Sequence, residues 1–228
     1  MKQLPLIVLL LLSLAAHAQT SDFGTELEAS ATFKLTKGTE LTLSEELRMK
    51  DNSHRYAKSE TSAALQYALL RKPLKQYDMR WRIGGGYSFI NRQNSEYRFT
   101  SQHRLMVQTS LSKDWSSWRL SARMRYQSTW RNPAAGSFRV NPQQYLRLRL
   151  SARYSPAATP WQLTLSEEVF CRIADPRGSL IDESRTQLSA TYDLNKHHSI
   201  TLYGKIAQEL QVANPERFFA LGISYDFQ

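Results

Sequence analysis

Residues 118–131 read Trp-Arg-Leu-Ser-Ala-Arg-Met-Arg-Tyr-Gln-Ser-Thr-Trp-Arg, and residues of two chemical kinds alternate along this stretch. The even positions run from Trp118 to Trp130 and are mostly apolar. The odd positions carry the arginines Arg119, Arg123, Arg125 and Arg131. A period of two places the two sets on opposite faces of a β-strand. At roughly 3.3 Å per residue and a tilt of about 45°, the strand rises roughly 28 Å, close to the roughly 25 Å apolar band of a transmembrane barrel.

The first residues of the chain have the pattern of a secretory signal peptide. Lys2 supplies a positive charge, residues 4–14 form a short apolar run, and Ala16-His17-Ala18 is a small-x-small cleavage site. We therefore expect residues 1–18 to be removed and residues 19–228 to form one folded unit. The apolar run is too short to span a bilayer as a helix, and no later segment approaches 18 consecutive apolar residues.

The rest of the chain repeats the alternation of residues 118–131 in segments separated by turn residues. Eleven such segments can be counted, with tight connections such as 37–38 and 113–116 alternating with longer ones such as 131–143 and 172–183. Bacterial single-chain barrels have an even number of strands, so ten or twelve is expected from the pattern. The sequence thus predicts an all-β protein, a single antiparallel transmembrane β-barrel of 10–12 strands.

Alternation alone does not say which face meets water, because a soluble lipocalin-like barrel would turn the same apolar face inward. Three features favour the membrane barrel. The segments run about eleven residues, the length that a tilted membrane strand needs. Aromatic residues gather near segment ends, as interface anchors do. The C-terminal stretch 222–227, with Gly222, Tyr225 and Phe227, is similar to the terminal signal by which barrels are recognised for insertion, although Gln228 follows the final aromatic.

The formal charge of +10 falls to +9 when Lys2 is removed with the signal peptide. An exported chain with no basic tail and no nucleic-acid motif is not expected to bind nucleic acid. The positive charge instead indicates a solvated surface, contact with anionic lipid or sugar, or attraction of anionic solutes.

Catalytic and metal-binding patterns are weak. Outer-membrane hydrolases need a histidine beside a serine or an acid, and His103 falls on the predicted lipid face without a serine nucleophile motif. The adjacent His197 and His198 sit in a turn, and no cluster has metal-ligand spacing. Cys171 is the sole cysteine, so no intrachain disulfide forms. We therefore expect no catalytic, metal-binding or cofactor-binding residues.

Several short motifs resemble those of one family of barrels. They are Asp22-Phe23-Gly24, Glu45-Glu46-Leu47-Arg48, Tyr97-Arg98-Phe99 with His103-Arg104, Arg123-Met124-Arg125-Tyr126-Gln127, Asn195-Lys196-His197-His198-Ser199 and Asn214-Pro215-Glu216-Arg217. Together they span nearly the whole mature chain and are similar to the family known as domain of unknown function 2490. The resemblance implies an outer-membrane β-barrel and supplies no catalytic residue. It also implies residence in outer-membrane lipid after insertion by the barrel assembly machinery.

If the apolar face meets lipid, the charged face lines the lumen. The expected basic wall consists of Arg80, Arg82, Arg98, Arg104, Arg119, Arg123, Arg125, Arg147, Arg149 and Arg153. The expected lumen-facing acids are Glu26, Glu28, Glu46 and Glu168. Buried charges must be paired, and four glutamates do not pair ten arginines, so part of the lumen is expected to be wet unless other carboxylates or the loops help.

Three functions follow from this lumen. A wet, arginine-lined barrel is a narrow pore for small anionic solutes, because tracks of arginine select anions electrostatically. A fully paired lumen is instead a non-conducting barrel that serves the envelope structurally or binds a partner through its loops. An outer-membrane hydrolase is the weakest alternative, for the reasons given for His103. In each case the barrel is expected to be a monomer without a cofactor.

Overall fold

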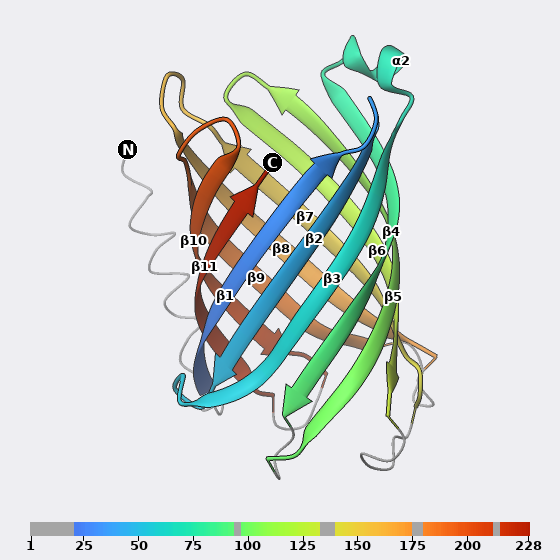
Figure 1. The fold of residues 1–228 in the computed structure, drawn as a ribbon, viewed down its shortest axis with the longest axis vertical. Coiled ribbons are helices and arrows are strands. Elements are labelled where there is room, and N and C mark those ends of the chain that lie inside the picture. Colours follow the sequence, from blue (N-terminus) through green and yellow to red (C-terminus); the bar gives the residue numbers. More distant parts are fainter. Residues whose placement is uncertain (1–20, 94–96, 133–139, 175–179, 212–214) are drawn as a thin grey trace.

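The computed structural model describes residues 21–93, 97–132, 140–174, 180–211 and 215–228. These residues form a closed β-barrel (Figure 1). The strands are β1 (Ser21–Lys34), β2 (Thr39–Lys50), β3 (Arg55–Leu69), β4 (Met79–Gln93), β5 (Phe99–Trp115), β6 (Trp118–Arg131), β7 (Gln143–Tyr154), β8 (Trp161–Ile173), β9 (Leu180–Asp193), β10 (His198–Glu209) and β11 (Arg217–Phe227). The predicted fold class is confirmed. The expected signal segment 1–18 lies outside the described residues.

The count of eleven described strands lies within the expected range, whereas the expectation of an even number is not met. Consecutive strands pair antiparallel, and β1 closes the barrel by pairing with β11 in parallel, from Ser21 opposite Arg217 to Ala31 opposite Phe227. Strands that alternate in direction put the first and the last of an odd set in the same direction. The parallel closure is therefore a geometric consequence of the odd count.

The two ends of the barrel differ in their connections (Figure 1). The end drawn uppermost, here called the turn end, carries the short connections 35–38, 116–117, 155–160 and 194–197. It also carries the helix α2 (Arg71–Lys75), between β3 and β4. At the opposite end, here called the loop end, the strands β2, β4, β6, β8 and β10 finish. Among the described residues no helix has the length and hydropathy to span a bilayer.

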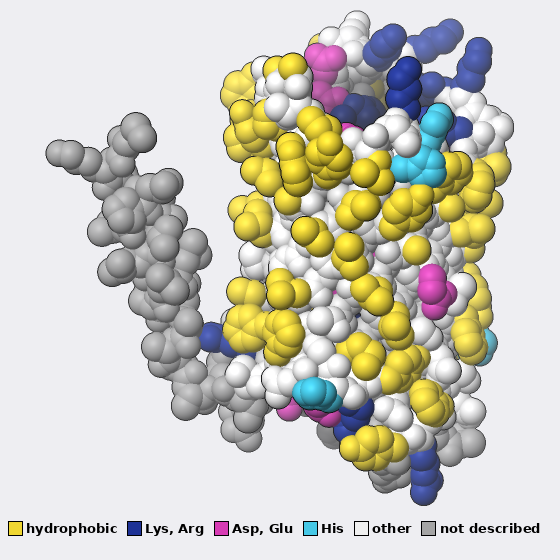
Figure 2. Space-filling view, turned by 60° about the vertical axis from the view of Figure 1, so that its left-hand side comes forward, with side chains coloured by type: hydrophobic (Ala, Val, Ile, Leu, Met, Phe, Trp, Pro, Cys, Tyr) yellow, Lys and Arg dark blue, Asp and Glu magenta, His cyan; other side chains and the backbone are white. Residues whose placement is uncertain are grey.

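Burial in this barrel is inverted relative to a water-soluble protein. The buried side chains include Glu26, Glu168 and Lys205, whereas Leu150 and Val107 are exposed by 67% and 64%. On the face that Figure 2 shows, hydrophobic side chains are spread over the outer surface between the two ends. A large outward apolar surface over a polar interior is the pattern of a transmembrane barrel, because the outer face meets lipid.

Aromatic side chains concentrate near the ends of the apolar band. At the turn end, Trp118 packs against Tyr154 and Trp161 against Tyr192, each pair with ring centroids 4.9 Å apart. Trp130 lies at the other end of β6, close to the loop end. These positions match the aromatic girdles that flank the lipid-facing band of a membrane barrel.

One glycine makes room for an inward aromatic ring. A Cβ on Gly222 of β11 would lie 2.1 Å from Cζ of Tyr203 on the neighbouring β10. The missing side chain lets the Tyr203 hydroxyl donate a hydrogen bond to Glu26 Oε2 at 3.0 Å. Gly222 therefore shapes the lumen, whereas Tyr225 and Phe227 of the same strand point outward.

Candidate functional site

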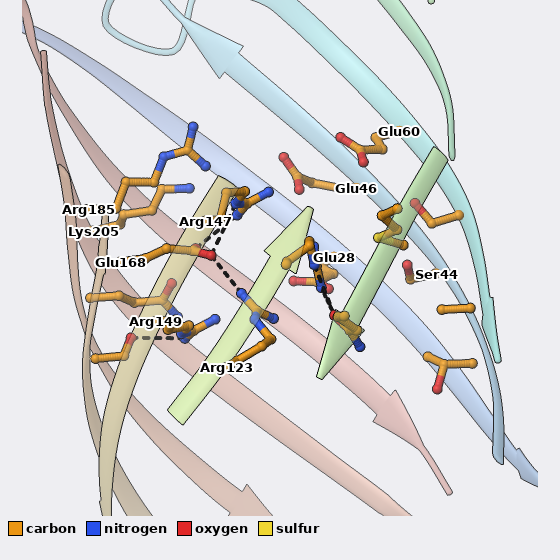
Figure 3. A pocket seen from close by; sticks show the side chains of 18 of the residues that line it. Glu28, Ser44, Glu46, Glu60, Arg123, Arg147, Arg149, Glu168, Arg185 and Lys205 are labelled. Carbon is orange, nitrogen blue, oxygen red and sulfur yellow. Dashed lines mark hydrogen bonds and ion pairs between the residues drawn. The ribbon is translucent and has the colours of Figure 1, made fainter. Parts of the chain in front are cut away.

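The charged lumen contains a cavity of about 350 Å³ between two walls of opposite charge. Figure 3 shows Arg123, Arg147 and Arg149 on one side and Glu28, Glu46 and Glu60 on the other. The charged residues that line it are Glu26, Glu28, Glu46, Arg48, Glu60, Arg123, Arg125, Arg147, Arg149, Glu168, Arg185 and Lys205. The basic wall comes mainly from β6 and β7, and the acidic wall comes from β1, β2 and β3.

The basic wall is a ladder of directly opposed arginines. The register of β6 and β7 places Arg123 opposite Arg149 and Arg125 opposite Arg147. Like charges in directly opposite positions repel each other, so the ladder needs an anion. Glu168 on β8 supplies one, because its carboxylate is 2.8 Å from Arg123 Nη2 and 2.9 Å from Arg147 Nη2.

An aromatic ring adds support beside this ion pair. The guanidinium carbons of Arg147 and Arg185 each lie 4.2 Å from the centroid of the Phe170 ring. Cation–π contacts of this kind favour charges that are shielded from water. Arg147 also donates a hydrogen bond to Gln127 Oε1 at 2.9 Å. The arginines nearest Glu168 are thereby held in place.

On the acidic wall, Glu26 is the most deeply buried carboxylate, with 2% of its surface exposed. Lys205 Nζ lies 2.5 Å from both of its oxygens, and Arg48 Nε lies 2.7 Å from Oε1. With the Tyr203 hydroxyl, these groups surround the carboxylate from two strands, β2 and β10. A buried carboxylate with two cationic partners is compensated for the loss of water.

The neighbouring carboxylates form a second network. Lys58 Nζ bridges Glu46 at 3.0 Å and Glu60 at 2.8 Å. Arg104 Nη1 reaches Glu60 Oε1 at 2.8 Å from β5. Much of the acidic wall is thus neutralised by cations of β2, β3, β5 and β10.

A second space of about 770 Å³ opens at the turn end and is here called the vestibule. Its cationic lining residues are Lys34, Lys37, Arg71, Lys72, Lys75, Arg80 and Arg82. The carboxylates that line it in the described residues are Glu40, Asp78 and Asp114. Basic side chains crowd one end of the molecule in Figure 2. Gln66 lines both the vestibule and the central cavity, so the two spaces adjoin.

Most of the expected lumen residues line the central cavity or lie at the vestibule end of the barrel. Arg123, Arg125, Arg147 and Arg149 line the central cavity with Glu26, Glu28, Glu46 and Glu168. Arg80 and Arg82 line the vestibule, and Arg119 pairs with Asp114 at the same end. Arg104 pairs with Glu60, and Arg153 is half-buried opposite Arg119. Arg98 does not belong to the wall: β5 begins at Phe99, and Arg98 is exposed just before it.

The charge surplus is smaller than the sequence indicated. Asp114 pairs with both Arg80 and Arg119, and Glu40 lies 3.4 Å from Arg82. Together with Glu60, these carboxylates form ion pairs with predicted wall arginines. None of the three belongs to the four glutamates that the sequence predicted to face the lumen. Continuing the alternation of residues 63–69 backwards would have placed Glu60 on the inner face, while Asp114 ends a strand and gives a weaker signal.

Other inward cations were missed as lumen residues. Arg48, Lys58, Arg185 and Lys205 lie on β2, β3, β9 and β10, outside the strands from which the basic wall was predicted. Their inward positions follow from the same alternation. The ion pairs that cross between distant strands do not, because they join residues far apart in the chain, such as Lys205 with Glu26.

His103 lies on the exposed outer face, as the pattern predicted. Its Nδ1 is 2.6 Å from the Tyr87 hydroxyl, and its ring packs near those of Tyr87 and Phe89. Cys171 is a free thiol. In the part of the chain that the structure describes, no group of three or more His, Cys, Asp or Glu residues has a geometry that could hold a metal ion.

Comparison with known proteins gives one family. The family model described as "Protein of unknown function (DUF2490)" matches residues 23–217. No curated protein matches the chain.

Two solved porin structures are similar to the barrel. The first is a porin refined at 1.8 Å resolution, with a TM-score of 0.34 and 16% identity over 84% of this chain. The chain spans 58% of the length of that porin. The second is an anion-selective porin from Comamonas acidovorans, with a TM-score of 0.32 and 9% identity over 84% of this chain and 82% of the porin.

Proposed function

The chain belongs to the DUF2490 family of proteins of unknown function, and on that premise we propose that it is an outer-membrane β-barrel whose lumen passes small anionic solutes. The observation that carries the proposal is that two adjoining spaces each have more cations than carboxylates in their lining. The export of the chain through a cleaved signal peptide, its insertion by the barrel assembly machinery and its action as a monomer are parts of the same proposal.

The outer surface supports placement in a membrane. Apolar side chains face outward from every strand, and aromatic pairs such as Trp118 with Tyr154 stand near the turn end. In outer-membrane barrels the short turns face the periplasm and the longer loops face outward. By this rule the vestibule opens to the periplasm and the loop end opens to the exterior.

The charge distribution supports anions as the solute. The vestibule forms one mouth of the lumen. Its described lining residues include seven cationic side chains and three carboxylates. Beyond Gln66, the arginine ladder of β6 and β7 continues the positive wall into the cavity. Fixed cations along a narrow path raise the local concentration of anions and repel cations.

The cavity limits the size of the solute. A space of about 350 Å³ corresponds to on the order of ten water molecules. Inorganic anions and small carboxylates fit such a space, whereas a sugar chain does not fit without movement of the walls. The proposal is therefore restricted to small solutes.

Reversal potentials of refolded protein in planar bilayers under a KCl gradient test the proposal. We expect conductance with a preference for chloride, and a lower chloride-to-potassium permeability ratio for the double variant Arg125→Gln/Arg149→Gln. Lys113→Gln removes an outward-facing charge and is the matched control, so it should leave the ratio unchanged. Conductance that prefers potassium would overturn the proposal.

A closed barrel is the second candidate, and the ion-pair networks around Glu26, Glu60 and Glu168 favour it. Such networks join facing strands through the lumen and would brace a barrel that serves the envelope or binds a partner. The same recordings separate the two: a silent bilayer with correctly folded protein assigns the networks to this structural role.

A further inference from the structure

Most lumen charges compensate one another, but three groups at the central cavity do not. Glu168 is shared by Arg123 and Arg147, Glu26 is held by Lys205 and Arg48, and Lys58 bridges Glu46 and Glu60. The groups outside these networks are Arg125, Arg149 and Glu28. All three line the same cavity.

The two arginines contact only neutral acceptors among the described residues. Arg125 donates from Nε and Nη2 to Gln108 Oε1 at 2.9 and 2.7 Å. Arg149 donates from Nη2 to Ser166 Oγ at 2.9 Å. A guanidinium has five N–H donors, so each retains donors for a further acceptor. Both charges are partly withdrawn from water, and no carboxylate of the described residues lies within ion-pair distance of either guanidinium, which favours an anionic ligand.

On the facing wall, the Glu28 carboxylate lacks a cationic partner among the described residues. The described residues give its carboxylate no hydrogen bond or ion pair, although it is only partly exposed. The register of β1 and β2 places Glu28 directly opposite Glu46, and like charges in this position repel. Figure 3 shows Glu28 across the cavity from Arg149. A cation bound here would relieve the repulsion.

We infer that the cavity binds an amino acid with two carboxylates, and this inference rests on the proposed passage of small anions. Its two carboxylates would meet Arg125 and Arg149, and its ammonium group would meet Glu28. The charges match, because two cations and one anion of the wall face two anions and one cation of the ligand. A cavity of about 350 Å³ accommodates a molecule of this size.

Arginine suits this task because its planar donors bind a carboxylate bidentately, whereas Glu28 accepts from the ammonium. The acidic wall then has a specific role. A plain dicarboxylate would satisfy the arginines but would place no cation against Glu28. The site thus distinguishes an acidic amino acid from a dicarboxylate of equal length.

The test is isothermal titration of refolded full-length protein with L-glutamate, with glutarate, which lacks the ammonium group, and with 4-aminobutyrate, which lacks one carboxylate. We expect L-glutamate to bind about tenfold tighter than either, since one charge-assisted contact is lost in each case. Glu28→Gln should remove the preference over glutarate, and Arg149→Gln should remove the preference over 4-aminobutyrate. Glu45→Gln removes an outward carboxylate and should change neither.

Equal binding of L-glutamate and glutarate to the wild-type protein would overturn the inference, as would a preference that survives Glu28→Gln. Should Arg149→Gln fail to fold, Arg149→Lys keeps the charge and loses bidentate geometry, so a weakened preference is still expected. Chloride conductance of the wild-type protein in the same preparation is the independent readout. Its absence together with intact L-glutamate binding would refute passage but keep the binding site.

Discussion

Replacing Glu168 by glutamine is expected to destabilise the barrel, because its carboxylate compensates two guanidiniums. The Glu168 side chain is 8% exposed. Its carboxylate accepts a hydrogen bond from Arg123 at 2.8 Å and two from Arg147, at 2.9 and 3.1 Å. Removing one partner of a buried ion pair costs about 3–5 kcal/mol. Arg147 keeps Gln127 and Phe170 as partners, and the cavity beside it has room for water. We therefore expect a loss of about 2–3 kcal/mol.

The assay is urea unfolding of the barrel refolded into lipid vesicles, followed by tryptophan fluorescence. Glu167→Gln provides the control, because Glu167 is the next residue, carries the same charge and faces outward, where it accepts a hydrogen bond from Thr186. The control should lose less than about 1 kcal/mol, because Glu167 lies on the lipid-facing surface, where a carboxylate adds little stability. If Glu168→Gln loses no more than Glu167→Gln, the claim that Glu168 holds the arginine ladder is refuted.

Three further outcomes are expected from the same structure. Gly222→Val should cost about 1–3 kcal/mol by forcing the Tyr203 ring aside, whereas Gly204→Ala, whose Cβ would meet its nearest neighbour at 3.9 Å, should be nearly neutral; equal losses in urea unfolding would contradict this steric account. Glu45→Leu should raise the free energy of unfolding by about 1–2 kcal/mol, since it removes a carboxylate from the lipid-facing surface; a loss of stability would show that the carboxylate is needed there. Arg82→Gln should lower the permeability to chloride more at 0.1 M than at 1 M salt, because screening weakens vestibule charges; an effect independent of salt would rule out this electrostatic role.

The period of two made the fold predictable. Residues 118–131 were identified as one strand, and β6 has these bounds. The same alternation separated lipid-facing from lumen-facing residues on β7 and β8, including Glu168. Closure was not predictable, because the parallel pairing of β1 with β11 depends on the whole strand count rather than on any local pattern.

The lumen was predicted as a set of charges but not as a network. Alternation tells which side of a strand Lys205 occupies, whereas its contact with Glu26 depends on the curvature that brings β10 near β1. The same curvature sets the acidic wall against the arginine ladder. For this reason the sequence predicted only that the lumen holds more arginines than carboxylates. The structure identifies Arg125 and Arg149 as the cavity arginines that form no ion pair with the described residues.

The central claim is that the charged face of the strands lines a wet lumen while the apolar face meets lipid. Neighbouring residues of β7 test it directly: Arg149 lines the cavity and Leu148 points outward. In a Cys171→Ser background, Arg149→Cys and Leu148→Cys are each exposed in vesicles to a charged thiosulfonate that does not cross lipid. The account predicts that Arg149→Cys reacts and Leu148→Cys does not. Equal reactivity, or faster reaction at Leu148→Cys, would contradict it.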